Sequence, residues 1–155
     1  MAPTSTTFTF YEGLEELPPF NPDKPQDVPA VLLFRQLVSE ADAVIFCTPE
    51  YAFGVPGVLK NALDWVVSTG EFNEKPVAAI SASPLTSGGD KALLSLVHTL
   101  TALGTIKDEQ STLGIPAVKK KINEQGKITD EITRMQLQAL LDHLLAIVKQ
   151  RLAVK

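Results

Sequence analysis

The chain has 155 residues, of which 45% are hydrophobic and 21% are charged, and its formal net charge is −4 at pH 7. This length predicts a single domain over residues 1–155, large enough to bury about two thirds of the surface that the unfolded chain exposes. The charge argues against nucleic-acid binding, because the longest basic run, Lys119-Lys120-Lys121, is typical of a solvated surface segment. No run of about 18 apolar residues occurs, so we expect no membrane span.

The cysteine and histidine content argues against a disulfide or metal site. Cys47 is the single cysteine and falls in an apolar run, so we expect a small buried side chain rather than a redox thiol. His98 and His143 lie on separate predicted helices without ligand spacing to Asp or Cys, so we expect no metal ligands. Residues 1–7 lack the basic region and apolar core of a secretory signal, which favours a cytoplasmic location.

The first half of the chain predicts two strands, with a loop and a helix between them. Thr7–Tyr11 alternates enough to form a short strand, and the proline-rich segment 12–25 predicts a surface loop. Pro29 then opens an amphipathic helix that extends to about Ala41. The next run, Ala43-Val44-Ile45-Phe46-Cys47, is apolar on both faces, as expected for a parallel strand covered by helices on both sides.

The same alternation continues through the second half. Apolar residues after Gly57 recur at helical spacing to about Ser68. Residues 76–80 predict a second buried strand, and an apolar stripe after Gly89 predicts another helix. Alternating strands and helices indicate an α/β sandwich with a mainly parallel sheet.

The C-terminal third is less regular until its last helix. Residues 105–113 predict at most an edge strand, because their apolar content is low. Thr129 or Asp130 is expected to cap the closing helix, whose wide apolar stripe is interpreted as core or partly as a dimer seam.

The turn Thr48–Val55 carries two aromatic side chains and a carboxylate at the C-terminal end of the first buried strand, where open α/β sheets bind ligands. A proline-stiffened turn of this kind suits a flat, partly apolar ligand whose edge bonds to backbone groups. Two alternatives stay open. Tyr51 and Phe53 can instead cap the sheet locally, and Glu50 can be an ordinary solvated carboxylate.

A second loop, Ser81–Gly89, follows the second buried strand. Its small residues let a ligand approach the backbone, and the N–H groups at the following helix start offer donors, although such loops are also ordinary connectors. The loop lacks the nucleophile-elbow pattern of a serine hydrolase. Because parallel neighbouring strands end at the same edge of a sheet, we expect both loops to reach one ligand.

Two segments carry a family resemblance: Thr48-Pro49-Glu50-Tyr51, and Val55-Pro56-Gly57-Val58-Leu59-Lys60-Asn61-Ala62-Leu63-Asp64-Trp65. They resemble the signature of the NAD(P)H-dependent FMN reductase family, which includes flavin, quinone, azo-dye and chromate reductases. The likeness extends from about Phe8 to the C-terminal helix, although the family usually has Asn where this chain has Ala52. It implies a flavodoxin-like three-layer sandwich with strand order 2-1-3-4-5.

The resemblance also implies FMN and NAD(P)H as cofactors, and hydride transfer from NAD(P)H via FMN to a flavin, quinone or similar small-molecule acceptor. The flavin carries the chemistry in such enzymes, so no catalytic side chain is assigned. A homodimer or homotetramer is implied. The residues carried over as cofactor contacts are Pro49, Glu50, Tyr51, Ala52, Phe53, Ser81, Ser83, Gly88 and Gly89.

The start of the sequence departs from the family pattern. Family members begin with an apolar strand and a Gly-Ser-x-Arg-x-x-Ser-x-Asn loop that holds the FMN phosphate at a helix start. Thr7–Tyr11 is instead followed by Glu12, Glu15 and Glu16, whose charges would repel a phosphate. We therefore align this strand with the family's second and expect the first βα unit, with its phosphate loop, to be missing.

Without a central strand, the second strand must pair directly with the third or leave an open groove. This departure keeps a second hypothesis open: a non-catalytic flavodoxin-like remnant that does not hold FMN. A one-electron flavodoxin-type carrier is disfavoured by the Pro-Glu-Tyr loop.

Overall fold

The computed structural model describes residues 3–25 and 27–153. In chain order the elements are η1 (Leu14–Glu16), α1 (Pro29–Glu40), β1 (Val44–Thr48), α2 (Gly57–Asp64), β2 (Val77–Ala82), α3 (Asp90–Ala102), η2 (Glu109–Ser111), β3 (Thr112–Ile115), η3 (Val118–Lys120) and α4 (Glu131–Ala153). The alternation of strands and helices confirms the α/β class.

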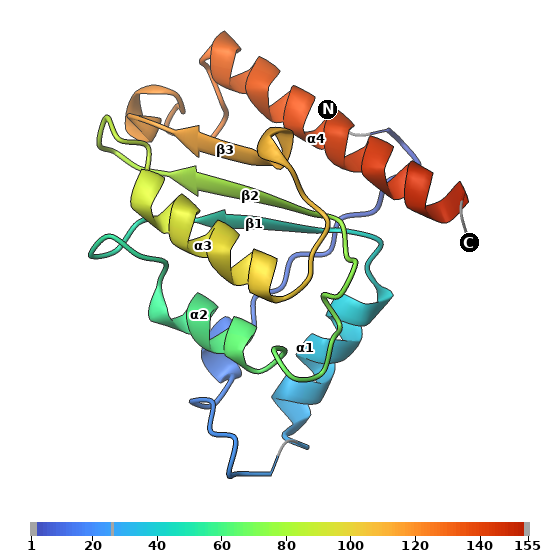
Figure 1. Cartoon of the computed structure of the whole chain (residues 1–155). Coiled ribbons are helices and arrows are strands. Elements are labelled where there is room, and N and C mark those ends of the chain that lie inside the picture. Colours follow the sequence, from blue (N-terminus) through green and yellow to red (C-terminus); the bar gives the residue numbers. More distant parts are fainter. Residues whose placement is uncertain (1–2, 26, 154–155) are drawn as a thin grey trace.

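Within these residues, the sheet has three parallel strands in the order β1-β2-β3. Val44 lies beside Val77 at one end of the β1–β2 pair, and Thr48 lies beside Ser81 at the other. α4 packs on Ala78 and Ile80 of β2, whereas Val77 and Ala79 belong to the cluster that includes residues of α1, α2 and α3. Because successive side chains of a strand point to opposite faces, helices cover both faces of β2 and form three layers (Figure 1).

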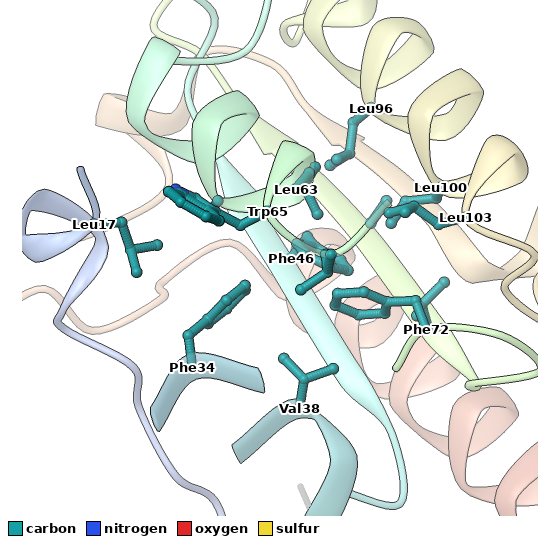
Figure 2. Close-up of a cluster of buried hydrophobic side chains, with 14 of the residues drawn as sticks. Leu17, Phe34, Val38, Phe46, Leu63, Trp65, Phe72, Leu96, Leu100 and Leu103 are labelled. Atoms are coloured by element: carbon teal, nitrogen blue, oxygen red, sulfur yellow. The ribbon is translucent and has the colours of Figure 1, made fainter. Parts of the chain in front are cut away.

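The larger core cluster gathers side chains from α1, β1, α2 and α3 (Figure 2). Its buried members include Phe34, Val38, Phe46, Leu63, Trp65, Phe72, Leu96, Leu100 and Leu103. Asn61 and Trp65 fasten the proline-rich segment to this core, since both side chains donate hydrogen bonds to the carbonyl oxygen of Pro18. The segment is irregular apart from η1, as its prolines predicted.

The expectation that β1 is buried on both faces is wrong. Ile45 keeps 37% of its surface exposed and Cys47 is also exposed, because α4 packs on β2 and β3. Cys47 is therefore not the buried small side chain that its apolar neighbours suggested. Neighbouring atoms nevertheless desolvate its sulfur enough to raise the pKa of the thiol.

The strand expected at Thr7–Tyr11 is also wrong, because these residues are irregular and Phe10 is 85% exposed. An isolated strand gains stability only by pairing. In the part of the chain that the structure describes, β1 pairs with β2 alone, so its other edge is open. Of the two arrangements expected without a central strand, the strand edge left without a partner agrees with this structure, and direct pairing of the Thr7–Tyr11 segment with β1 does not.

Other boundaries differ from the predicted ones at element ends. α2 ends at Asp64 and continues as turns towards Thr69, whereas the helical pattern extended to about Ser68. β3 starts only at Thr112, at the end of the segment in which an edge strand was expected. Asp130 caps α4, since its Oδ1 accepts the backbone N–H of Thr133 at 2.9 Å.

α4 is tied to η2 by one polar cluster. Asp108 accepts hydrogen bonds from the backbone N–H and hydroxyl of Ser111, and its carboxylate oxygens lie 2.9 Å from Nε2 of His143. Desolvation works against ionisation of Asp108, but the hydrogen bonds from Ser111 and His143 outweigh it and lower the pKa of the carboxyl.

Over residues 3–25 and 27–153, no helix combines the length and apolar character needed to cross a bilayer. The same residues contain no group of three or more His, Cys, Asp and Glu side chains arranged to hold a metal ion.

Candidate functional site

The loop after β1 ends in a tight two-residue turn. Tyr51 and Gly54 exchange backbone hydrogen bonds of 2.9 and 3.0 Å, while Ala52 and Phe53 adopt left-handed φ angles of 47° and 62°. These angles resemble a type I′ turn, which normally favours Gly or Asn. Tyr51 and Phe53 are 65% and 78% exposed, so the rings project outward and do not cap the sheet.

The turn leaves polar backbone groups at its tip. Among the described residues, no hydrogen bond is found from the amide N–H of Ala52 or Phe53. These two donors lie between the exposed rings of Tyr51 and Phe53 in sequence. The tip can therefore present apolar rings and amide donors to the edge of a flat ligand.

Glu50 joins the first predicted loop to the helix that follows the second one. Its Oε2 accepts the backbone N–H groups of Lys91 and Ala92, at 2.9 and 3.0 Å, in the first turn of α3. The N-cap residue of α3, Gly89, has no side chain to do this, so Glu50 caps the helix from a distant part of the chain. The two amides are engaged, which corrects the expectation that the first turn of this helix offers these donors to a ligand.

Ser81, Gly88 and Gly89 pack beneath the contact between Glu50 and α3. Ser81 is fully buried, and its Oγ donates to the carbonyl oxygen of Gly88 at 2.7 Å. Gly89 has a φ of 76°, and a Cβ there would lie 3.2 Å from Cβ of Ser81 and 3.5 Å from Cβ of Glu50. Only glycine therefore combines this backbone angle with this close approach.

Ser83 is buried as well, and its Oγ accepts the backbone N–H of Leu85 at 3.1 Å. The hydroxyls of Ser81 and Ser83 thus hold the shape of the loop from inside. Sequence reasoning placed both residues at the right edge of the sheet, but their hydroxyls are used within the protein.

Both loops lie at the arrowhead ends of β1 and β2, on the same edge of the sheet (Figure 1). The printed contacts bring Glu50, Ser81, Gly88 and Gly89 into one cluster. Pro49 is next to this cluster and accepts the hydroxyl of Thr48 through its carbonyl oxygen. The tip, Tyr51 to Phe53, projects away from it, and Ser83 lies deeper in its own loop.

The structure also shows a surface hollow that sequence reasoning missed. It is a wide-open hollow of about 610 Å³ between Phe53 of the 48–55 loop and the outer face of α3, and its lining is Phe53, Lys91, Leu94, Ser95, His98 and Thr99. The helical residues recur at positions i, i+3, i+4, i+7 and i+8, which is the pattern of one exposed helix face. The helical face could have been predicted from this periodicity. The position of Phe53 beside that face depends on tertiary contacts and could not.

The residues present fit the ring of FMN better than its phosphate. An exposed aromatic tip with unengaged amides and a glycine backbone suits a flat heterocycle with carbonyl groups on its edge. Neither loop, residues 48–55 or 81–89, contains a Lys or Arg, and the first α3 amides are bound to Glu50. A phosphate would have to be held by other groups.

Comparison with known proteins identifies the family of the chain. A model of the NADPH-dependent FMN reductase family matches residues 4–119, which include both loops and all three described strands. The NAD(P)H-dependent FMN reductase PA1204 of Pseudomonas aeruginosa is 37% identical over 118 residues, which cover 72% of this chain and 64% of that protein.

Two further relatives align over more of their length. The 2-hydroxy-1,4-benzoquinone reductase of a Burkholderia species is 33% identical over 155 residues, covering 97% of this chain and 84% of that protein. FerB, a flavoenzyme NAD(P)H:(acceptor) oxidoreductase of Paracoccus denitrificans, superposes with a TM-score of 0.79 at 31% identity, covering 88% of this chain and 78% of that one. The family model covers more than half of the sequence, and the chain belongs to the NADPH-dependent FMN reductase family.

Proposed function

We propose that the chain is an NAD(P)H-dependent oxidoreductase that binds FMN where the 48–55 and 81–89 loops meet and reduces a flavin, quinone or similar acceptor. The observation that carries this proposal is the bond between Glu50 and the start of α3, directly after the 81–89 loop, which holds the 48–55 loop beside Gly89 at the C-terminal end of the sheet. Family membership supports it, because the members are flavin-dependent reductases.

The side chains of the site orient the cofactor rather than react. When bound, FMN supplies the hydride chemistry between NAD(P)H and the acceptor. The amides of Ala52 and Phe53 would donate to the carbonyl edge of the ring, and the exposed ring of Tyr51 would shield one side of it from water. Gly88 and Gly89 would hold the loop in shape beneath the ring, since a Cβ at either position would press on neighbouring protein atoms.

A quinone is the acceptor that the comparisons favour. Relatives from Burkholderia, Arabidopsis thaliana and Pseudomonas putida are named as quinone reductases or quinone oxidoreductases. A flat quinone also suits a site built from exposed aromatic rings and backbone donors.

Self-association into a homodimer or homotetramer is part of the proposal, as is a cytoplasmic location. Ile132 and Met135, which are exposed apolar side chains one turn apart on α4, offer a contact for a second copy. The single cysteine agrees with a reducing compartment.

The test is NADPH oxidation by the purified chain with and without added FMN, using 1,4-benzoquinone as acceptor. We expect the loss of NADPH absorbance to require FMN and to accelerate with quinone. Binding of FMN without NADPH oxidation would contradict the proposed reductase activity while leaving the FMN site in place. Failure to bind FMN at all, with no NADPH oxidation, would overturn the proposal in favour of the non-catalytic flavodoxin-like remnant.

A further inference from the structure

The outer edge of β1 carries backbone groups that face away from the sheet. Within the described part of the chain, β1 pairs with β2 alone and so lies at one side of the sheet (Figure 1). The backbone N–H of Val44 donates to the carbonyl oxygen of Pro76, directly before β2, at 3.0 Å. Backbone groups alternate in direction along a strand, so those of every second residue from Val44 face β2, and those of Ile45 and Cys47 face outward. The edge therefore offers both donors and acceptors.

The side chains of these two residues make the same edge apolar. Ile45 and Cys47 lie beside Ala78 and Ile80 of β2, which are covered by α4, so they share that face of the sheet. α4 does not extend over β1, and both side chains are exposed. Val44–Thr48 contains no charged residue and no proline, which are the residues that usually protect an edge strand from pairing with another chain. This edge is therefore a surface on which a further strand can add.

A second copy of β1 matches this edge. The nearby segment of the same chain that sequence alone predicted to be a strand, Thr7–Tyr11, is irregular and leaves the edge unpaired. If two β1 strands run antiparallel about a two-fold axis at Phe46, all five residues of each strand overlap and Ile45 lies opposite the partner's Cys47. Residues paired in this way exchange both of their N–H···O=C bonds. The two symmetric pairs then use every outward group of both strands, and they place an apolar side chain beside an apolar side chain.

We propose that two copies of this chain associate through β1 into one continuous sheet, ordered β3-β2-β1 in one protomer and β1-β2-β3 in its partner. Because β1 runs antiparallel to its copy, the two 48–55 loops lie at opposite ends of the joined sheet, and each protomer keeps its own candidate flavin site. The inference deepens the self-association that is part of the proposed function. It uses a surface other than Ile132 and Met135 of α4, and none of its tests requires FMN.

The first test is sedimentation velocity of the full chain over a range of protein concentrations. Ile45→Lys places a charge at the centre of the proposed interface and should raise the dissociation constant of the dimer roughly tenfold or more. The side chain of Ile45 is 37% exposed, so a lysine there can reach water in the monomer. Met135→Lys, at an exposed position on α4, is the matched control and should leave the dissociation constant unchanged. A chain that stays monomeric up to about 100 μM, or a dimer weakened only by Met135→Lys, would overturn the inference.

Hydrogen exchange of single amides identifies the edge without any substitution. Dimer formation should slow exchange of the Ile45 and Cys47 amides about tenfold or more, because both N–H groups become bonded. The Ala52 amide, for which no hydrogen bond is found among the described residues, should exchange at the same rate in both samples. Protection of Ile45 and Cys47 that does not change with protein concentration would mean that another part of the same chain covers the edge, and would overturn the inference.

Cross-linking tests the register. The Cα atoms of a hydrogen-bonded antiparallel pair lie about 5.5 Å apart, which a disulfide can span. Ile45→Cys should therefore form disulfide-linked dimers with the partner's Cys47 when diamide is added as oxidant. The two Cys47 thiols of the unaltered chain are offset by two residues, beyond the about 7 Å limit, and should not join. Glu124→Cys, on an exposed turn, is the control, and equal cross-linking of the two variants would contradict the proposed pairing.

Discussion

The bond between Glu50 and α3 leads to the sharpest mutational prediction. Glu50→Ala removes the acceptor of two backbone N–H groups, Lys91 at 2.9 Å and Ala92 at 3.0 Å, and α3 has no other side-chain cap at its start. Hydrogen bonds to a charged group contribute about 1.5–3 kcal/mol, and a lost N-cap costs about 0.5–2 kcal/mol. Since Glu50 is partly exposed, we expect a loss of about 1–2 kcal/mol of unfolding free energy.

Urea unfolding measures this loss, and a chain of this size should melt about 2–8 °C lower. Glu50→Gln keeps an acceptor oxygen but loses the charge at the helix start, so it should lose only about 0.3–1 kcal/mol. Hydrogen exchange of the Lys91 and Ala92 amides should accelerate in the alanine variant. Glu124→Ala, on an exposed turn, is the control. If Glu50→Ala matches this control in stability and amide exchange, the capping argument is refuted.

Three further predictions concern other parts of the chain. Gly89→Ala should lower the unfolding free energy by roughly 1–3 kcal/mol, and by more than Gly70→Ala does. Both glycines have φ near 80°, but only Gly89 has neighbouring atoms that a Cβ would crowd. Equal losses for the two variants in urea unfolding would contradict this. The pKa of Asp108 is lower in the folded state than in the unfolded state, so the ionised carboxylate contributes fully to stability above about pH 4 and this contribution is lost as the pH falls through the folded pKa. Asp108→Asn should therefore reduce the loss of unfolding free energy on acidification. An unchanged loss would count against the contact with His143. Cys47 should react with a thiol reagent in the native state, but more slowly at neutral pH than a free cysteine; labelling only after unfolding would show it buried.

Much of the site could be predicted from local sequence. Pro49, Gly54 and the aromatic residues between them marked the loop after β1, and small residues marked the loop after β2. Parallel β-strand pairing then determined that both loops share one edge, because Thr48 lies beside Ser81. The placement of these loops therefore followed from strand length, turn residues and the rule for parallel strands.

What sequence could not provide depends on contacts between distant segments. The partner of Glu50 lies on α3, and nothing in the pattern around residue 50 identifies it. The exposure of Cys47 depends on where α4 ends its cover of the sheet, and the irregular conformation of Thr7–Tyr11 depends on whether a partner strand is beside it. An apolar or alternating pattern shows that a segment is able to form a buried strand. Whether it does so depends on a neighbouring strand to pair with and on helices that pack over it.

The central claim is that the two joined loops bind FMN, and a fluorescence titration of FMN with the purified chain tests it most directly. The account predicts saturable quenching at a single FMN per chain, weakened by Glu50→Ala and unaffected by Glu124→Ala. FMN fluorescence that stays constant throughout the titration, or binding that is equally tight without the Glu50 carboxylate, would contradict it.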